Sequence, residues 1–234
     1  MLRSISIWLV WISFTSYAFF FAPPNQPDTF DLILDLSTGN WQDINPLIIS
    51  LFNLMGVLPM IYACFLFIDG KGQKIWAWPF AIASFGVGAF ALLPYLALRK
   101  GSSPPFEGGA CEPRQPNPDW QGEKNLLLKI LDSPLTGIAL TLGTIVLLSF
   151  GLLYGNWADF IQQWQTSRFI HVMSLDFCIL CLFFPALIKD DLARRGIEQN
   201  WVLWAISFIP LFGTLVYLCL RPPLPETRVE NQLT

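Results

Sequence analysis

Six long apolar stretches alternate with polar segments along the chain. They cover residues 5–22, 46–68, 75–98, 135–155, 169–188 and 201–220. Each has about the 17 to 25 residues that an α-helix needs to cross about 30 Å of hydrocarbon. Helices are expected because unpaired backbone groups in lipid are costly, and the alternating pattern of a barrel strand is absent. The pattern predicts an all-α, polytopic membrane bundle of about six transmembrane helices.

The spacing of the apolar stretches divides the chain into two three-helix units. The first unit covers residues 1–100 and the second covers residues 135–222. Residues 101–134 form a connection rich in proline and glycine, and residues 223–234 form a polar tail. Neither this connection nor the acidic loop at 23–45 has the pattern of a folded domain.

Two shorter features qualify this division. Arg3, a short apolar run and Ser16-Tyr17-Ala18 resemble a signal peptide with a cleavage site, but the apolar run continues through residues 19–21, which favours a retained helix. Between the fourth and fifth stretches, apolar side chains recur at i, i+3, i+4 and i+7. They are Trp157, Phe160, Ile161 and Trp164. That stripe predicts a short helix in the membrane interface.

Composition agrees with a membrane protein and excludes one class of partner. Hydrophobic residues make up 53% of the chain and charged residues 13%, whereas soluble domains carry about a quarter charged residues. The net charge is −3, and no basic run is longer than two residues. We therefore expect the lipid bilayer as the first partner and no nucleic-acid binding.

The end of the third stretch is similar to the end of the sixth. Tyr95-Leu96-Ala97-Leu98-Arg99 matches Tyr217-Leu218-Cys219-Leu220-Arg221, and each copy follows a tryptophan-bearing start, a charged turn and a span with an internal proline. Chance similarity between apolar helices is one interpretation. The other is an internal repeat. Because three crossings make each unit, the second unit would then enter from the opposite side, as a 3+3 inverted-topology repeat.

Basic residues do not settle the orientation of such a bundle. With an inside N-terminus, six lysines and arginines fall inside and eight outside. The loop at 23–45 contains four aspartates and no basic residue, so it is the segment best suited to cross the membrane. Both termini are accordingly predicted to be cytoplasmic.

The fifth stretch holds the densest set of polar residues. His171, Asp176, Cys178 and Cys181 occur within eleven residues of one another. An ionised carboxylate near the centre of a membrane helix costs about 2.5 kcal/mol or more unless it is paired or protonated. Asn53 has the comparable place in the first unit, so a polar pair at the repeat interface is expected.

Asn53, His171 and Asp176 are therefore the candidate ligand-binding residues. They suit a proton relay, a polar ligand site or, for His171, an axial ligand to a tetrapyrrole magnesium. The alternative is that the Asp and the His only bind a neighbouring helix.

Cys178 and Cys181 form a C-x-x-C that suits either a redox pair or two inert buried cysteines. Quinone-linked thiol oxidoreductases use two further loop cysteines, and Cys111 is the single one that a loop offers here. Because the chain has one histidine, no metal cluster is expected, and no nucleophile elbow or phosphate loop is present.

Two segments resemble a known family. Phe169 to Pro222, with Asp176, Asp191-Leu192-Ala193-Arg194-Arg195-Gly196 and Trp201, resembles small uncharacterised membrane proteins of bacteria, cyanobacteria and plastids. Asn53 to Arg99, with Asp69-Gly70-Lys71-Gly72, is similar to plastid and cyanobacterial relatives. The resemblance implies a thylakoid or plasma membrane of a photosynthetic cell. It implies no activity and no catalytic residue.

These observations favour a non-enzymatic membrane protein that assists a photosynthetic membrane complex or binds chlorophyll, carotenoid or quinone within it. A small transporter or channel with a polar site at the membrane midplane is one alternative. A membrane enzyme that acts on an isoprenoid or other lipid, with Asp176 as its acid, is the other.

Overall fold

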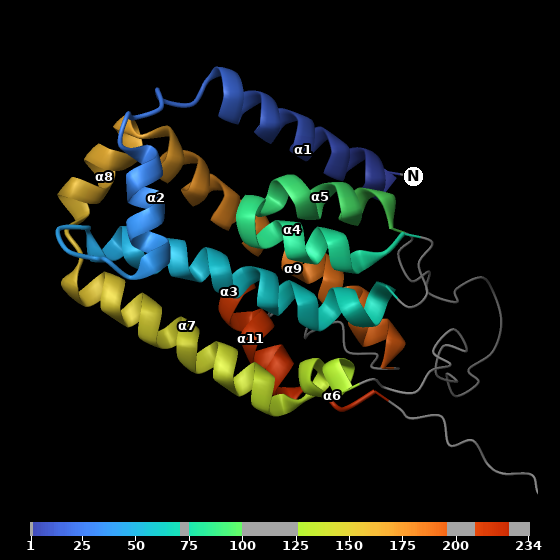
Figure 1. Cartoon of the computed structure of the whole chain (residues 1–234). Helices are drawn as coiled ribbons and strands as arrows, with labels where there is room; N and C mark the ends of the chain where they lie inside the picture. The colour runs from blue at the N-terminus through green and yellow to red at the C-terminus, as the bar shows by residue number, and fades with distance from the viewer. Residues whose placement is uncertain (1, 71–74, 100–125, 196–208, 225–234) are drawn as a thin grey trace, which may run out of the picture.

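The computed structural model describes residues 2–70, 75–99, 126–195 and 209–224, and every regular element in these ranges is a helix (Figure 1). The helices are α1 (Leu2–Phe20), α2 (Thr29–Thr38), α3 (Pro46–Asp69), α4 (Ala77–Val87), α5 (Ala89–Leu98), α6 (Leu126–Asp132), α7 (Pro134–Tyr154), α8 (Trp157–Thr166), α9 (Arg168–Arg194) and α11 (Pro210–Leu220). The prediction of an all-α protein is confirmed over the described residues.

Three of these helices are long and apolar enough to cross a membrane. They are α3, α7 and the part of α9 from Arg168 to Ala193. With at least 21 residues, each is about 30 Å long or longer. Of the most apolar window of α7, 17% is buried by the protein, so most of that helix is left to face lipid. The predicted membrane character is confirmed to this extent.

The four longest helices form two parallel pairs. α1 and α7 begin at the end of the molecule where Arg3 and Asp132 take part in ion pairs, and α3 and α9 finish there (Figure 1). At the opposite end, Ile48 of α3 packs in one cluster with Ile170 of α9. α1 and α7 therefore run in one direction, and α3 and α9 run in the other.

The third predicted span, residues 75–98, is not one helix. It breaks at Gly88, whose φ of +51° lies in the left-handed region that glycine adopts without steric cost, and α4 packs against α5. Ala77 of α4 lies beside the end of α3, and Arg99, directly after α5, has its Nη1 3.0 Å from Asp69 Oδ2 at that same end. The segment enters and leaves at one end of the molecule, so the prediction of a single crossing helix was wrong.

We call this end, which holds Asp69, Arg99 and Asp191, the ionic end. The sixth predicted span finishes there too. Its residues 201–208 lie outside the described residues, and α11 is followed by Arg221, whose Nη1 is 3.5 Å from Asp191 Oδ2 near the end of α9. Among the described elements, only α1, α3, α7 and α9 run from one end to the other, and the six-span bundle is not confirmed.

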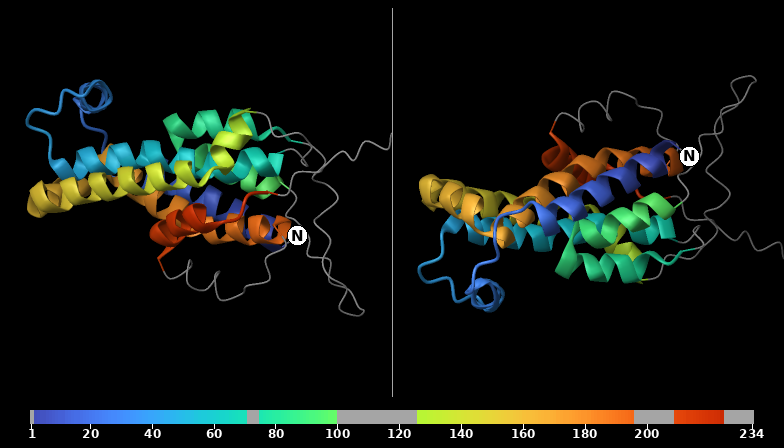
Figure 2. Two further views of the ribbon diagram at one scale, coloured as in Figure 1. Left: turned by 90° about the horizontal axis from the view of Figure 1, so that it is seen from below. Right: turned by 90° about the horizontal axis from the view of Figure 1, so that it is seen from above.

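The shorter helices flank the long ones on opposite sides. α5 packs along α1, α11 packs along α7, and α3 and α9 pack together in the centre. In both views of Figure 2 the α4–α5 hairpin and α11 lie on opposite sides of the long helices. The centre is filled by large, fully buried aromatic side chains, among them Tyr62 and Phe184, whose ring centroids are 4.7 Å apart.

The segments between the spans contain three short helices, of which the sequence predicted one. α8 confirms the predicted short helix, and Asn156 caps it by accepting two backbone N–H bonds. α2 lies inside the acidic loop at 23–45, where no helix was expected. Its Leu36 is buried against α3, and Gly39, with φ of +83°, ends it. α6 occupies the end of the 101–134 connection, of which residues 101–125 lie outside the described residues.

Candidate functional site

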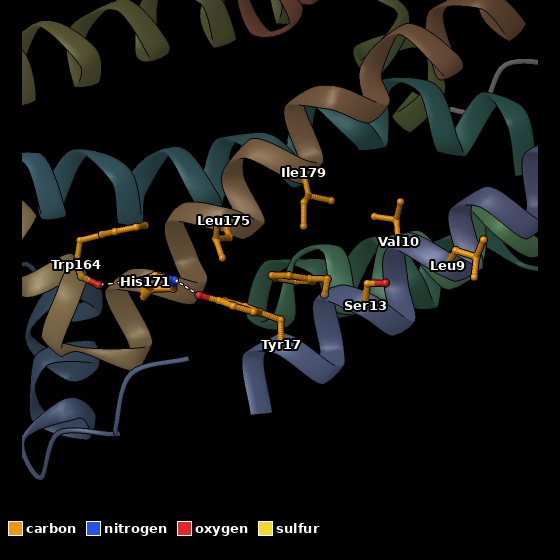
Figure 3. A pocket seen from close by; sticks show the side chains of 9 residues that line it. Leu9, Val10, Ser13, Tyr17, Trp164, His171, Leu175 and Ile179 are labelled. Carbon is orange, nitrogen blue, oxygen red and sulfur yellow. Dashed lines mark hydrogen bonds between the residues drawn. The ribbon is translucent and has the colours of Figure 1, made fainter. Parts of the chain in front are cut away.

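An open, mainly apolar groove of about 600 Å³ lies between α1 and α9 (Figure 3). Ligand pockets in proteins typically have about 300 to 1,000 Å³. Leu9, Val10 and Ser13 line it from α1, and Leu175 and Ile179 line it from α9. The groove exists because α1 packs along α5 and leaves the facing side of α9 uncovered.

Helical periodicity places the lining residues in two facing stripes. On α1, Ser13 and Tyr17 are four residues apart, and on α9, His171 and Leu175 are also four residues apart. Residues at i and i+4 lie on one face of a helix. Because α1 and α9 run in opposite directions, Tyr17 near the end of α1 meets His171 near the start of α9. The groove is therefore polar at this end and apolar along most of its length.

His171 is held on three sides (Figure 3). Its Nε2 is 2.9 Å from Tyr17 Oη, and its Nδ1 is 2.9 Å from the carbonyl oxygen of Trp164. Its ring stacks on that of Trp164, with centroids 4.2 Å apart. The side chain is 6% exposed, so its position is fixed by these neighbours.

The contacts of His171 define its tautomer when the ring is neutral. The Trp164 carbonyl can only accept a hydrogen bond, so Nδ1 of His171 carries the proton and donates. Nε2 is then an acceptor, and the Tyr17 hydroxyl donates to it. The lone pairs of Tyr17 Oη remain available, which makes the polar end of the groove a hydrogen-bond acceptor.

Asp176, the second predicted site residue on α9, lies elsewhere. Its side chain is buried and its Oδ1 accepts a 2.7 Å hydrogen bond from the backbone N–H of Ala89, the first residue of α5. A Cβ on Gly88 would overlap its Oδ2. Helix N-termini expose unpaired N–H groups and favour negative charge. Asp176 thus stabilises the break between α4 and α5, which accounts for a carboxyl group at this depth.

Asn53, the third predicted site residue, bonds within its own helix. Its Nδ2 donates a 2.8 Å hydrogen bond to the carbonyl oxygen of Ile49. No hydrogen bond joins Asn53 to Asp176 in the described ranges. The structure thus brings His171 into the groove, and it places Asn53 and Asp176 against other partners.

The two cysteines of the C-x-x-C motif on α9 differ in environment. Cys178 is exposed on the protein surface and Cys181 is buried, and both are free thiols. Neither lines the groove.

The ionic end contains two buried clusters that sequence reasoning missed. In the first cluster, the Arg99 guanidinium lies between Asp69 and Asp190, and Arg3 also contacts Asp190. The Tyr95 hydroxyl donates to Asp69 Oδ2 over 3.3 Å. The side chains of Arg99 and Asp69 are 0% exposed, so each charge depends on the other for its stability.

The second cluster is built in the same way. Arg195 contacts Asp191 at 2.8 Å and Asp132 at 2.7 Å. Arg221 also lies beside Asp191, and its guanidinium stands 5.4 Å from the centroid of a phenylalanine ring of α3. The Tyr217 hydroxyl donates a 2.8 Å hydrogen bond to Asp191 Oδ2. Four arginines and four aspartates make up the two clusters, so their charges balance.

The pKa of Asp132 reflects this cluster. Burial by itself would raise the pKa of the carboxyl group, but the positive charge of Arg195, its hydrogen bond and the backbone N–H of Leu224 lower the pKa below its ordinary value. The repeated Tyr-x-x-x-Arg at the ends of the third and sixth stretches was the signal in the sequence. It was interpreted as an internal repeat at the ends of two spans, and local similarity did not reveal its buried aspartate partners.

No group of three or more His, Cys, Asp or Glu side chains in the described part of the chain is arranged to hold a metal ion. In comparisons with known proteins, no family model, no curated protein and no solved structure matches the chain.

Proposed function

We propose that this chain is an integral membrane protein that binds an elongated apolar molecule of the quinone or pigment class in the groove between α1 and α9. Binding there assists the assembly or stability of a membrane complex. The observation that supports the proposal is the groove itself, in which two apolar stripes lead to the Tyr17–His171 pair. The role is one of binding, and no reaction step is required of the protein.

The chemistry of the groove fits a molecule with an isoprenoid tail and one small polar head. The tail would lie along Leu9, Val10, Leu175 and Ile179, where burial of apolar surface contributes about 25 cal/mol per Å². With His171 neutral, Tyr17 Oη accepts, so a hydroxyl-bearing head such as that of a quinol is favoured. The Ser13 hydroxyl, one helical turn away, offers a donor for a quinone carbonyl.

A hydroxylated carotenoid satisfies the same requirements. Chlorophyll fits less well, because both ring nitrogens of His171 already have partners and Nε2 would have to release Tyr17 to bind a magnesium ion. We therefore rank quinol or quinone first, carotenoid second and chlorophyll third. The proposal that the partner is a thylakoid complex rests on the family resemblance described above.

The first test is a purification of the tagged protein in mild detergent from its native membranes, followed by an absorption spectrum and by mass spectrometry of the extracted lipids and the co-purifying proteins. Near-stoichiometric quinone or carotenoid supports the binding role, and subunits of a photosynthetic complex support that partner. A colourless preparation with no quinone argues against the groove as a ligand site.

A direct titration tests the location of binding. Quinones quench nearby tryptophan emission, and Trp164 lines the groove. Decylubiquinone, added to the protein in liposomes, should quench a component that Trp164→Phe removes, and decylubiquinol should compete with it. Trp157→Phe is the matched control, because Trp157 lies on the same short helix, is exposed and does not line the groove.

A small transporter is the second candidate, and a different observation favours it. The N-terminus of α5 and the carboxyl group of Asp176 meet inside the bundle, and broken helices with buried charges are typical of transporter binding sites. Solute or proton flux in liposomes that Asp176→Asn abolishes would support this function, provided that the variant remains folded. Equal flux in empty and protein-containing liposomes would eliminate it for the solutes used.

A further inference from the structure

One tyrosine, one aspartate and one arginine have the same spacing in each of the two ionic clusters. Tyr95 bonds Asp69 and Tyr217 bonds Asp191, and each pair is separated by 26 residues. Arg221 and Asp191 are 30 residues apart, as are Arg99 and Asp69. Corresponding members of the two clusters therefore differ by one constant offset of 122 residues. A constant offset with the same side-chain contacts is not expected from chance similarity between apolar helices.

Two pairs of helices follow the same offset, whereas α1 and α7, which begin at Leu2 and Pro134, differ by 132 residues. α3 begins at Pro46 and α9 at Arg168, which again differ by 122 residues, and the break at Gly88 corresponds to the start of α11 at Pro210. The neighbours agree as well, because α1 packs along α5 in the first half as α7 packs along α11 in the second. The correspondence thus extends from the charged residues to whole elements.

Corresponding helices point in the same direction. α3 and α9 both finish at the ionic end, and α1 and α7 both begin there. α4 and α5, with 11 and 10 residues, are each about 16 Å long, which is about half the thickness of the hydrocarbon core. Each half thus contains two long helices and one segment that returns to the ionic end.

We infer that the chain is a tandem duplication whose two units lie in the membrane in the same orientation. Each unit has two crossing helices and one re-entrant segment, and the ionic end faces the cytoplasm. α1 is less apolar than α3, α7 and α9, and we count it as a crossing helix because its 19 residues span about 28 Å and it runs from one end of the molecule to the other. Two crossings per unit return the chain to its starting side, so the second unit repeats the orientation of the first. The predicted inverted repeat is replaced by a parallel one because the third span does not cross.

Within a bilayer, a break in a helix is stable where its backbone is buried in protein and its polar groups are hydrogen-bonded. That condition is met at Gly88: its N–H bonds the carbonyl oxygen of Ser84, and the N–H of Ala89 bonds Asp176 of the other unit. The indole N–H of Trp11 also donates to the carbonyl oxygen of Phe90 over 3.0 Å. Contacts from α1 and α9 thus satisfy polar groups at the tip of the hairpin.

The distribution of basic residues indicates which end of the molecule faces the cytoplasm. Seven basic residues occur on elements at the ionic end: Arg3, Arg99, Lys129, Lys189, Arg194, Arg195 and Arg221. At the opposite end the described segments carry Arg168 and the aspartates Asp28, Asp31, Asp35, Asp43 and Asp159. The other six of the 14 basic residues lie outside the described ranges. Cytoplasmic segments are enriched in Lys and Arg, so the ionic end and the Leu2 end of α1 are assigned to the cytoplasm.

Single-cysteine labelling of the full chain tests the inference. In a background in which the five native cysteines are replaced by serine or alanine, four exposed positions are compared: Asn40→Cys, Lys129→Cys, Gln162→Cys and Lys189→Cys. The variants are produced in the plasma membrane of a bacterial host, and a membrane-impermeant maleimide is applied to intact cells and then to permeabilised cells. Retained expression and a normal elution profile on size exclusion show that each variant is folded.

The inferred topology predicts that Asn40→Cys and Gln162→Cys are labelled in intact cells, and that Lys129→Cys and Lys189→Cys are labelled only after permeabilisation. Six crossing helices would place Asn40 with Lys129 and Lys189, on the side away from Gln162, and that pattern would overturn the parallel duplication. If the two pairs of variants group as inferred but Lys129→Cys and Lys189→Cys are the pair labelled in intact cells, the assignment of the ionic end to the cytoplasm is overturned.

One consequence concerns the groove and rests on the proposed function. Tyr17 and His171 lie toward the end opposite the ionic end, so the head of a bound quinol would lie in the leaflet away from the cytoplasm. Labelling needs no ligand, so failure of the topology and failure of ligand binding are separate results.

Discussion

Two of the interfaces between the halves of the molecule differ in how closely they are packed. α3 of the first half and α7 of the second make the most extensive contact between any two of the described helices, and the Ser50 hydroxyl donates a 2.7 Å hydrogen bond to the carbonyl oxygen of Leu147. A Cβ on Gly151 would lie 2.6 Å from Ser50 Oγ. α1 and α9 meet instead through the groove, with Tyr17 and His171 in contact at one end of it.

Under the inferred duplication these interfaces are equivalent, and the difference lies in a few side chains. α7 presents glycine to α3, which lets the two backbones approach. α1 presents Leu9, Ser13 and Tyr17 to α9, and these side chains line the open groove. Two copies of one arrangement can thus supply one interface for stability and one for binding.

The largest expected effect is on the closed interface. Gly151→Leu should lower the free energy of unfolding by about 1–3 kcal/mol, because the new side chain must displace Ser50 and separate α3 from α7. Thermal unfolding in detergent measures the change. Gly143→Leu is the matched control on the same helix, because a Cβ there meets nothing within 4 Å. Equal melting temperatures for the two variants would show that the α3–α7 contact is not close.

Filling the groove should reduce ligand binding and leave the melting temperature nearly unchanged. Leu175→Trp is expected to reduce the amount of retained quinol or quinone at least tenfold, or about 1.4 kcal/mol, with little change in melting temperature, because the added ring occupies open space. Mass spectrometry of extracted lipid measures retention. Leu182→Trp places the same substitution on the lipid-facing side of α9, at a side chain that is 68% exposed. Undiminished retention in Leu175→Trp would place the ligand elsewhere.

A smaller effect is expected from the polar end of the groove. Tyr17→Phe removes the hydroxyl that bonds His171 and should weaken quinol binding by about 0.5–1.5 kcal/mol, while an analogue with a tail and no polar head binds as before. Titration in liposomes compares the two ligands. Tyr154→Phe, at an exposed tyrosine of α7, serves as the control. A parallel loss for both ligands would indicate that the hydroxyl only holds α1 and α9 together.

The last prediction concerns the ionic end and appears only as the pH falls. The pKa of Asp132 is lowered in the folded protein, so its stabilising contribution is complete above the ordinary value of 3.8 and is lost as pH falls through the folded value. The melting temperature of the wild type should therefore fall more steeply below pH 4 than that of Asp132→Asn. Asp31→Asn, on the exposed face of α2, should leave the wild-type acid profile unchanged.

Local patterns were sufficient to predict several elements. The long apolar runs of α3, α7 and α9 and the amphipathic stripe of α8 were found because apolar length and helical period are properties of neighbouring residues. The break at Gly88 was not found, since a glycine in an apolar run is common in membrane helices. It becomes a turn because Asp176, 87 residues away, binds the N–H of Ala89.

In the candidate site, too, features of neighbouring residues were predicted and contacts between distant residues were not. His171 was identified because a lone histidine in an apolar run is unusual. Its partner Tyr17 was not, because it stands 154 residues earlier in a stretch that also resembled a signal peptide. Asn53 and Asp176 were predicted to form a pair from their similar positions in the two units, and the structure gives them separate partners.

The sequence by itself determined that this is an apolar, helical protein with a repeated Tyr-x-x-x-Arg segment, because composition, hydrophobic length and local similarity need no tertiary contact. The tertiary structure decided which apolar runs extend from end to end, which arginines are buried with aspartates, and where the groove lies. Those features depend on pairs such as Asp69 with Arg99 and Tyr17 with His171, and distance along the chain does not specify which side chains meet.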